Sequence, residues 1–182
     1  MKPDYTVAVC VLSSGSKGNA IYVSGGSTSI LIDAGLSGIE IERRMATRDI
    51  RPESLDAIIV SHEHTDHIQG VGVLARRFNL PVYISQKTEK AANQLGIISD
   101  FNYFDCGTSF RINDLTLHPF SVSHDAEDPA GFTVGQNGVT IGVATDLGHA
   151  PSMVKEHLKN CAFLVLEANH DIDMLVDYHY LL

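Results

Sequence analysis

Seven residues decide the fold of this chain: Ser61-His62-Glu63-His64-Thr65-Asp66-His67. They place three imidazoles and two carboxylates side by side. The apolar run before them, residues 55–60, is typical of a buried strand, and residues 68–78 after them are predicted to form a helix. A loop between a strand and a helix can present ligands to a crevice at the carboxyl ends of the strands. We therefore expect the imidazoles of His62 and His64, two residues apart, to point the same way.

The composition of this loop indicates a metal site. Neutral imidazole and carboxylate suit zinc, with manganese or iron as alternatives. A plainer interpretation is a polar loop in which Thr65 or Asp66 caps the following helix. Capping requires one such residue and leaves three histidines unexplained, so the pattern favours metal binding.

The signature resembles the H-x-H-x-D-H motif of the metallo-β-lactamase-fold hydrolases. Further elements of that family follow in its order: an early Asp in Leu31-Ile32-Asp33-Ala34-Gly35, a lone His in Ser121-Val122-Ser123-His124-Asp125, and a bridging Asp in Gly142-Val143-Ala144-Thr145-Asp146-Leu147-Gly148. The resemblance is closer still to the YycJ/WalJ branch, through residues 13–19, 104–107 and 166–171. It covers nearly the whole chain.

The resemblance implies a four-layer αβ/βα sandwich, formed by a single domain over residues 1–182. It also implies two divalent ions, and it assigns their ligands as follows: His62, His64 and His124 for one ion, Asp66 and His67 for the other, and Asp146 as the bridge. Asp66 would also orient a water or accept its proton. Asp33 would fix a histidine ring from behind, although a strand-end turn residue is the alternative for it.

Members of this branch continue past the point where this chain stops, and their last metal-binding His lies there. We therefore expect the C-terminal part of the fold to be missing and the second metal site to be the weaker one. His170 and His179 are the remaining late histidines. His170 is a candidate for substrate contact or metal ligation, with a packing role as the alternative.

Local patterns support an α/β class without the resemblance. Short β-rich runs separated by Gly/Ser turns predict strands at residues 7–12, 20–23, 29–33, 82–85, 115–122, 132–136, 139–144 and 163–167. Apolar spacing predicts helices at residues 39–48 and 151–159. Asn137-Gly138 is a hairpin signal.

The composition limits the compartment and the partners that we expect for the protein. The chain has 182 residues, a formal charge of −9 and three dispersed cysteines. No apolar stretch is long enough to span a bilayer and no signal segment is visible, so we expect a cytoplasmic protein with reduced thiols and no membrane partner. The acidic balance argues against a broad basic surface for nucleic acid. Oligomeric state is not indicated.

Three classes of function remain open. The resemblance favours a metal-dependent phosphodiesterase or nuclease, in which a metal-bound hydroxide attacks DNA, RNA or a small phosphodiester. A hydrolase of small esters, thioesters or lactams would use the same hydroxide. A non-catalytic metal-binding remnant of a truncated hydrolase is the third class.

Overall fold

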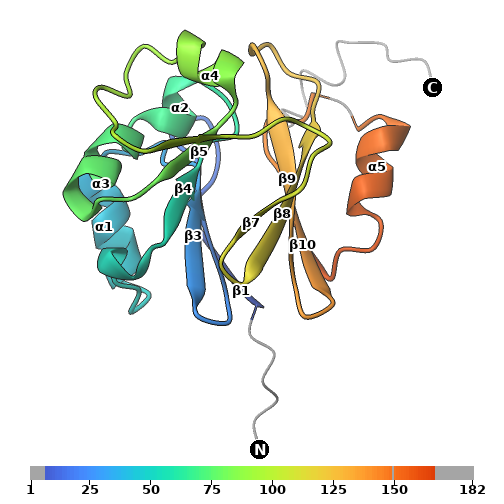
Figure 1. Ribbon diagram of the computed structural model, residues 1–182, viewed down its shortest axis with the longest axis horizontal. Helices are drawn as coiled ribbons and strands as arrows, with labels where there is room; N and C mark the ends of the chain where they lie inside the picture. The colour runs from blue at the N-terminus through green and yellow to red at the C-terminus, as the bar shows by residue number, and fades with distance from the viewer. Residues whose placement is uncertain (1–6, 149, 167–182) are drawn as a thin grey trace, which may run out of the picture.

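The computed structural model of the protein describes residues 7–148 and 150–166. Two β-sheets face each other, and helices cover the outer face of each (Figure 1). The described residues include no helix that is long and apolar enough to cross a membrane.

The first sheet has six strands in the order β1-β2-β3-β4-β5-β6. Their bounds are Val7–Ser13, Ala20–Gly25, Thr28–Ile32, Ala57–Ile59, Val82–Ile84 and Phe101–Tyr103. The strands β1 to β3 form an antiparallel meander, whereas β3 to β6 are parallel and are connected through helices. Every residue of β4 is buried, as expected of a parallel strand covered on both faces.

The second sheet has five strands in the order β11-β10-β9-β8-β7. Their bounds, in chain order from β7, are Phe110–Ile112, Leu115–Ser121, Ala130–Gln136, Val139–Ala144 and Phe163–Leu166. Neighbouring strands are antiparallel except for β10 and β11, which are parallel. The Asn137-Gly138 turn joins β9 to β10 with both residues in the left-handed region, as its sequence predicts.

The core has three parts, one between each pair of adjoining layers. Residues such as Ile41, Leu74 and Ile58 pack between the first sheet and helices α1 (Gly38–Ala46) and α3 (Val71–Phe78). A second cluster, which includes Ile32 and Phe132, fills the space between the two sheets. A small third cluster lies under α5 (Ser152–Leu158) on the outer face of the second sheet. The order helix, sheet, sheet, helix confirms the predicted four-layer sandwich.

The helix predicted at residues 68–78 is wrong as a single helix. The chain forms α2 (Thr65–Ile68) and then α3, with a break at Gly70. The Gly70 amide donates to the Ala34 carbonyl oxygen at 2.7 Å. A Cβ at this glycine would lie 2.4 Å from the carbonyl oxygen of Leu36. The break therefore comes from close tertiary contact with the loop after β3, which apolar spacing does not report.

Four short elements were not predicted: the 3₁₀ helix η1 (Pro52–Ser54), α4 (Gln86–Ala91), β6 and β7. Each strand is only three residues long, too short to produce a periodic pattern. The other predicted strands and helices are present, with described ends that differ by at most two residues.

Candidate metal centre

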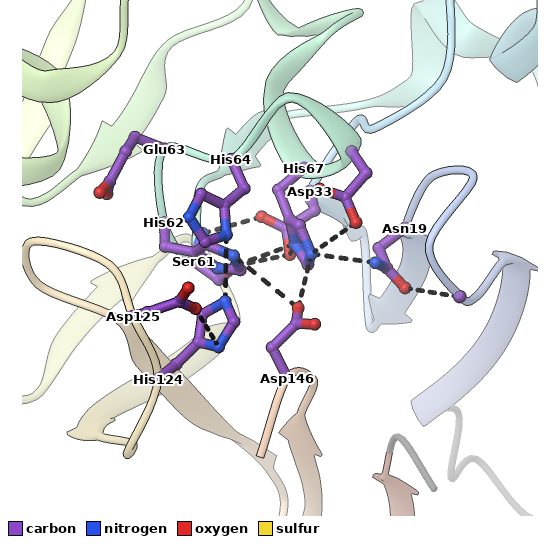
Figure 2. Close-up of polar contacts among 12 residues, drawn as sticks. Asn19, Asp33, Ser61, His62, Glu63, His64, His67, His124, Asp125 and Asp146 are labelled. Carbon is purple, nitrogen blue, oxygen red and sulfur yellow. Dashed lines mark hydrogen bonds and ion pairs between the residues drawn. The ribbon is translucent and has the colours of Figure 1, made fainter. Parts of the chain in front are cut away.

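The polar residues of the site follow the carboxyl ends of strands from both sheets. Asp33 comes directly after β3, and the histidine motif begins two residues after β4. His124 follows β8, and Asp146 follows β10. The parallel and antiparallel strands that precede these residues all end at the same edge of the sandwich, so four separate loops converge there (Figure 2).

Two of these loops hold an aspartate in a left-handed backbone conformation. The φ angles are 60° at Asp33 and 52° at Asp146. Non-glycine residues adopt this region rarely, although Asp is among the more tolerant. At both positions the chain turns sharply out of its strand, which directs the carboxylate back toward the histidines.

His62, His64 and His124 form the first group of ligand atoms. One ring nitrogen of each lies within 4.8 Å of the others. The Nε2 of His124 lies 3.0 Å from the Nδ1 of His64. Imidazole nitrogens from two loops therefore meet at one point, an arrangement suited to a cation that accepts their lone pairs.

His62, His67 and Asp146 form a second group. The Nε2 of His67 lies 2.6 Å from the Oδ2 of Asp146, and the Nε2 of His62 lies 3.8 Å from the same oxygen. His62 belongs to both groups, so the two groups adjoin. Asp66 stands beside the second group, with its Oδ2 3.8 Å from the Nε2 of His67.

Asp33 holds Ser61 and His67 in place through its carboxylate. Its Oδ1 accepts a hydrogen bond from the Ser61 amide, and its Oδ2 accepts one from the Ser61 hydroxyl, both at 2.8 Å. The same Oδ2 lies 2.8 Å from the Nδ1 of His67. Asp33 thereby fixes the ring of His67 with its Nε2 toward the second group.

Sequence reasoning did not predict a side-chain role for Ser61 or Asn19 in the metal centre. The Ser61 hydroxyl lies 3.0 Å from the Nδ1 of His62 and 3.2 Å from that of His67. The side-chain nitrogen of Asn19 lies 2.9 Å from the Nε2 of His67. In the sequence only their positions pointed to the site, because Ser61 directly precedes His62 and Asn19 ends the Ser13–Asn19 segment. Neither residue type by itself indicates a metal site.

The charges of the two buried histidines differ. Burial, helped by the neighbouring His67, holds the pKa of His62 well below its usual range, so this ring is neutral and can offer a lone pair. Burial also lowers the pKa of His67, but Asp33 first and then Asp146 outweigh that effect and raise it to about 10. Without a cation, His67 is therefore an imidazolium held between two carboxylates.

The contacts of His67 Nε2 show that a cation fits this position. An amide nitrogen only donates, so the Asn19 contact requires a lone pair on Nε2, whereas the Asp146 contact requires a proton there. A divalent ion would accept lone pairs from both Nε2 and the carboxylate, so the Asp146 contact would no longer require a proton on Nε2. The buried Nε2 of His62 has no hydrogen-bond partner within the described ranges, which also suits a ligand atom.

Three further residues stand out in the sequence: Glu63, which lies between two of the histidines, and the late His170 and His179. Glu63 points away from the histidines, and its Oε1 accepts a hydrogen bond from the Glu127 amide at 2.8 Å, which ties the motif to the loop that carries His124. His170 and His179 lie outside the described residues.

The sequence model of the family described as "Beta-lactamase superfamily domain" matches residues 28–180, and the chain therefore belongs to that superfamily. Among solved structures, the metallo-β-lactamase fold protein YhfI from Bacillus subtilis superposes with a TM-score of 0.71. It is 17% identical, and the match covers 87% of this chain and 70% of YhfI. This likeness supports the metallo-β-lactamase fold.

Curated relatives include two named nucleases. The chain is 38% identical over 168 residues to "Exodeoxyribonuclease YycJ" of Bacillus anthracis, covering 91% of this chain and 64% of that protein. It is 36% identical over 170 residues to "Exodeoxyribonuclease WalJ" of Streptococcus pneumoniae, covering 91% and 63%. The chain thus spans somewhat less than two thirds of the length of these relatives.

Proposed function

We propose that the protein is a metal-dependent phosphodiesterase that acts on DNA as an exonuclease. The observation that carries this proposal is the pair of adjoining ligand groups that meet at His62. Two close divalent ions suit phosphodiester cleavage because charge develops on both the attacking and the leaving oxygen. The similarity to proteins named YycJ and WalJ exodeoxyribonucleases supports DNA as the substrate.

For the first ion we propose His62, His64 and His124 as ligands, and for the second His67, Asp66 and Asp146. The contacts between His64 and His124 and between His67 and Asp146 support this division. Zinc suits these donors, with manganese or iron as alternatives. When bound, the ions supply Lewis acidity and lower the pKa of a bound water toward about 7.

The chain's own residues orient and hold the site. Asp33 and Ser61 fix the rings of His67 and His62 from below. The side chain of Asp66 is 31% exposed, in contrast to the fully buried His67, so a solvent molecule can reach its carboxylate. We propose that Asp66 accepts the proton of the attacking water, and that Asp146 holds the two ligand groups together.

We also propose a reducing, cytoplasmic setting. The three cysteines are free thiols, and none forms a disulfide in the part of the chain that the structure describes. Free thiols are typical of a reducing compartment.

The test is a cleavage assay with metal-loaded protein on 5′-labelled DNA and RNA. We expect DNA to be shortened from one end, and His124→Ala to reduce the rate at least a hundredfold because it removes a ligand. The matched control is His118→Ala, since His118 lies on β8 and contacts Ser109 rather than the site. Cleavage of neither nucleic acid would refute the proposal.

The second candidate is a hydrolase of small esters, thioesters or lactams, which the same ligand groups would serve. A panel of bis-p-nitrophenyl phosphate, a thioester and a β-lactam separates the two classes. Turnover of the thioester or lactam without the phosphodiester would favour the second candidate. Bound metal without turnover of any substrate would favour a non-catalytic metal-binding protein.

A further inference from the structure

The carboxamide of Asn19 is fully buried, and its orientation is determined by its hydrogen bonds. The side-chain Oδ1 accepts a hydrogen bond from the Gly15 amide at 3.1 Å. Because a backbone N–H can only donate, the oxygen must face Gly15 and the Nδ2 must face the metal centre. The backbone is held as well, since the Asn19 amide donates to the Asp66 carbonyl at 2.7 Å and its carbonyl accepts from the Gly35 amide at 2.8 Å.

This fixed donor points at a ligand atom of the proposed second ion. The Nδ2 of Asn19 lies 2.9 Å from the Nε2 of His67, and Figure 2 shows the amide directed toward that ring from the side opposite His64. A ring nitrogen that coordinates a cation has no lone pair left to accept a hydrogen bond. In the loaded site the ring nitrogen therefore offers Asn19 no acceptor, while the Nδ2 still faces the metal centre.

We propose that Asn19 is a substrate-binding residue whose Nδ2 donates a hydrogen bond to a phosphoryl oxygen. The inference rests on the proposed function, because it takes a phosphate group bound beside the second ion. An oxyanion held there supplies the acceptor that a buried donor requires. Asn19 also adds a donor where the neighbouring groups are acidic, since Asp66 and Asp146 each have a carboxylate oxygen within 3.8 Å of the His67 ring nitrogen.

The loop that carries Asn19 is seated rigidly enough for this role. Gly18 has a φ of 140°, and a Cβ there would lie 2.6 Å from the Gly35 carbonyl oxygen. The Gly18 amide closes a turn by donating to the Gly15 carbonyl at 2.9 Å. The donor is thus preorganised, so little ordering is required when a phosphate binds.

A purely structural role for Asn19 makes a different prediction for its two variants. Asn19→Asp keeps the oxygen that accepts from Gly15 but replaces the donor with a second carboxylate oxygen. If Asn19 only holds its loop, Asn19→Ala lowers metal affinity and phosphate affinity together, because the loop beside His67 loses its support. If Asn19 donates to a phosphoryl oxygen, Asn19→Asp weakens phosphate binding more than Asn19→Ala does.

The experiment measures binding of inorganic phosphate to metal-loaded protein by calorimetry, and binding of the metal alone to each variant. We expect phosphate affinity to fall about tenfold in Asn19→Ala, the usual effect of one hydrogen bond to a charged group. We expect a larger fall in Asn19→Asp, with metal affinity not reduced in either variant. The control is Asn137→Asp, which adds the same charge in the β9–β10 turn. This turn lies at the start of β10, whereas Asp146 follows the end of that strand.

Unchanged phosphate affinity in Asn19→Asp, or no phosphate binding by the loaded wild type, would overturn the inference. Cleavage of DNA is measured separately. A wild-type protein that binds phosphate through Asn19 but cleaves no DNA would refute the proposed function and leave this inference standing. A protein that cleaves DNA but whose Asn19→Asp variant binds phosphate normally would refute this inference and leave the proposed function standing.

Discussion

Asp33 lies fully buried beneath the histidine motif and accepts from the amide and hydroxyl of Ser61 while its Oδ2 contacts the ring of His67. A buried carboxylate is costly unless it is paired and hydrogen-bonded, and here both conditions are met. The residue contributes no ligand to either proposed ion. Its importance lies in the orientation that it imposes on His67.

Asp33→Ala is expected to lower the free energy of unfolding of the metal-free protein by about 3–5 kcal/mol, because it leaves the buried imidazolium of His67 without one of its two carboxylate partners. Urea unfolding at pH 7 measures this. Asp114→Ala is the control, since Asp114 also accepts three hydrogen bonds but at the surface. An equal loss in both variants would show that burial of the Asp33–His67 pair is not the cause.

His67 should release a proton when a metal binds. Its pKa of about 10 means that the metal-free ring is protonated at neutral pH, whereas coordination requires a free lone pair. Binding at this group should therefore release about one proton at pH 7.5 and should tighten as pH rises toward 10. In the metal-free protein, the raised pKa contributes stability below the unfolded value of 6.5 that is lost as pH rises through about 10.

Calorimetric titration of metal in buffers of different ionisation enthalpy counts the released protons. We expect two binding steps, a tighter one at the three-histidine group and a weaker one that carries the proton release. The proton should disappear in His67→Ala and persist in His118→Ala. Two equally tight steps without proton release would contradict the assignment of His67 to the weaker site.

At the scale of elements, the site is held by contacts between loops. The Ala34 amide donates to the His67 carbonyl at 2.8 Å, and the Gly70 amide donates to the Ala34 carbonyl at 2.7 Å. The loop between β3 and α1 is thereby seated against the histidine motif and α2. These backbone hydrogen bonds hold the motif in place independently of its side chains.

Gly35→Ala should separate these loops. A Cβ at Gly35 would lie only 1.5 Å from the Asp66 carbonyl oxygen, so the backbone must move. We expect a loss of about 3 kcal/mol or more in unfolding free energy, together with reduced metal occupancy. Chemical unfolding and elemental analysis measure the two effects.

The control for this substitution is Gly135→Ala in β9, where the nearest atom to the added Cβ would be 3.7 Å away. Its unfolding free energy should stay within about 0.5 kcal/mol of the wild type. A Gly35→Ala variant that is as stable as Gly135→Ala would mean that the two loops do not pack as closely as described.

At the scale of the whole molecule, charge limits how a nucleic acid can bind. The formal charge is −9, and several arginines are already paired with acids on the outer helices. Arg43 and Arg44 both pair with Glu40, and Arg77 pairs with Glu42. We infer that a nucleic acid would be held mainly at the metal centre, because these basic side chains do not form a continuous surface.

DNA binding should accordingly depend weakly on salt. We expect the logarithm of the binding constant to fall with the logarithm of salt concentration with a slope shallower than about −3, since few phosphates would be neutralised by lysine or arginine. Fluorescence anisotropy with metal-loaded protein and a phosphorothioate DNA, between 50 and 200 mM salt, measures this slope. A slope steeper than about −5 would indicate a basic surface that the charges described above do not provide.

Much of this protein was predictable from residue types and spacing. The α/β class, the strand before the histidine motif and the Asn137-Gly138 hairpin follow from local patterns, because apolar alternation and turn chemistry act over a few residues. The family resemblance carried by the motif residues predicted the four-layer sandwich, which the structure confirms. It also led to the ligand assignments, which remain predictions. The structure places all of those ligands except the late histidines at one edge of the sandwich.

Only the tertiary structure decided how these residues meet. The break at Gly70, the support of the His67 ring by Asp33, and the contact of the Asn19 amide with that ring all depend on atoms more than twenty residues apart in the chain. Apolar spacing reports which face of an element is buried, but it does not report which loop lies against that element. The packing of the two sheets brings the strand ends together, and the distances within the site follow from that packing.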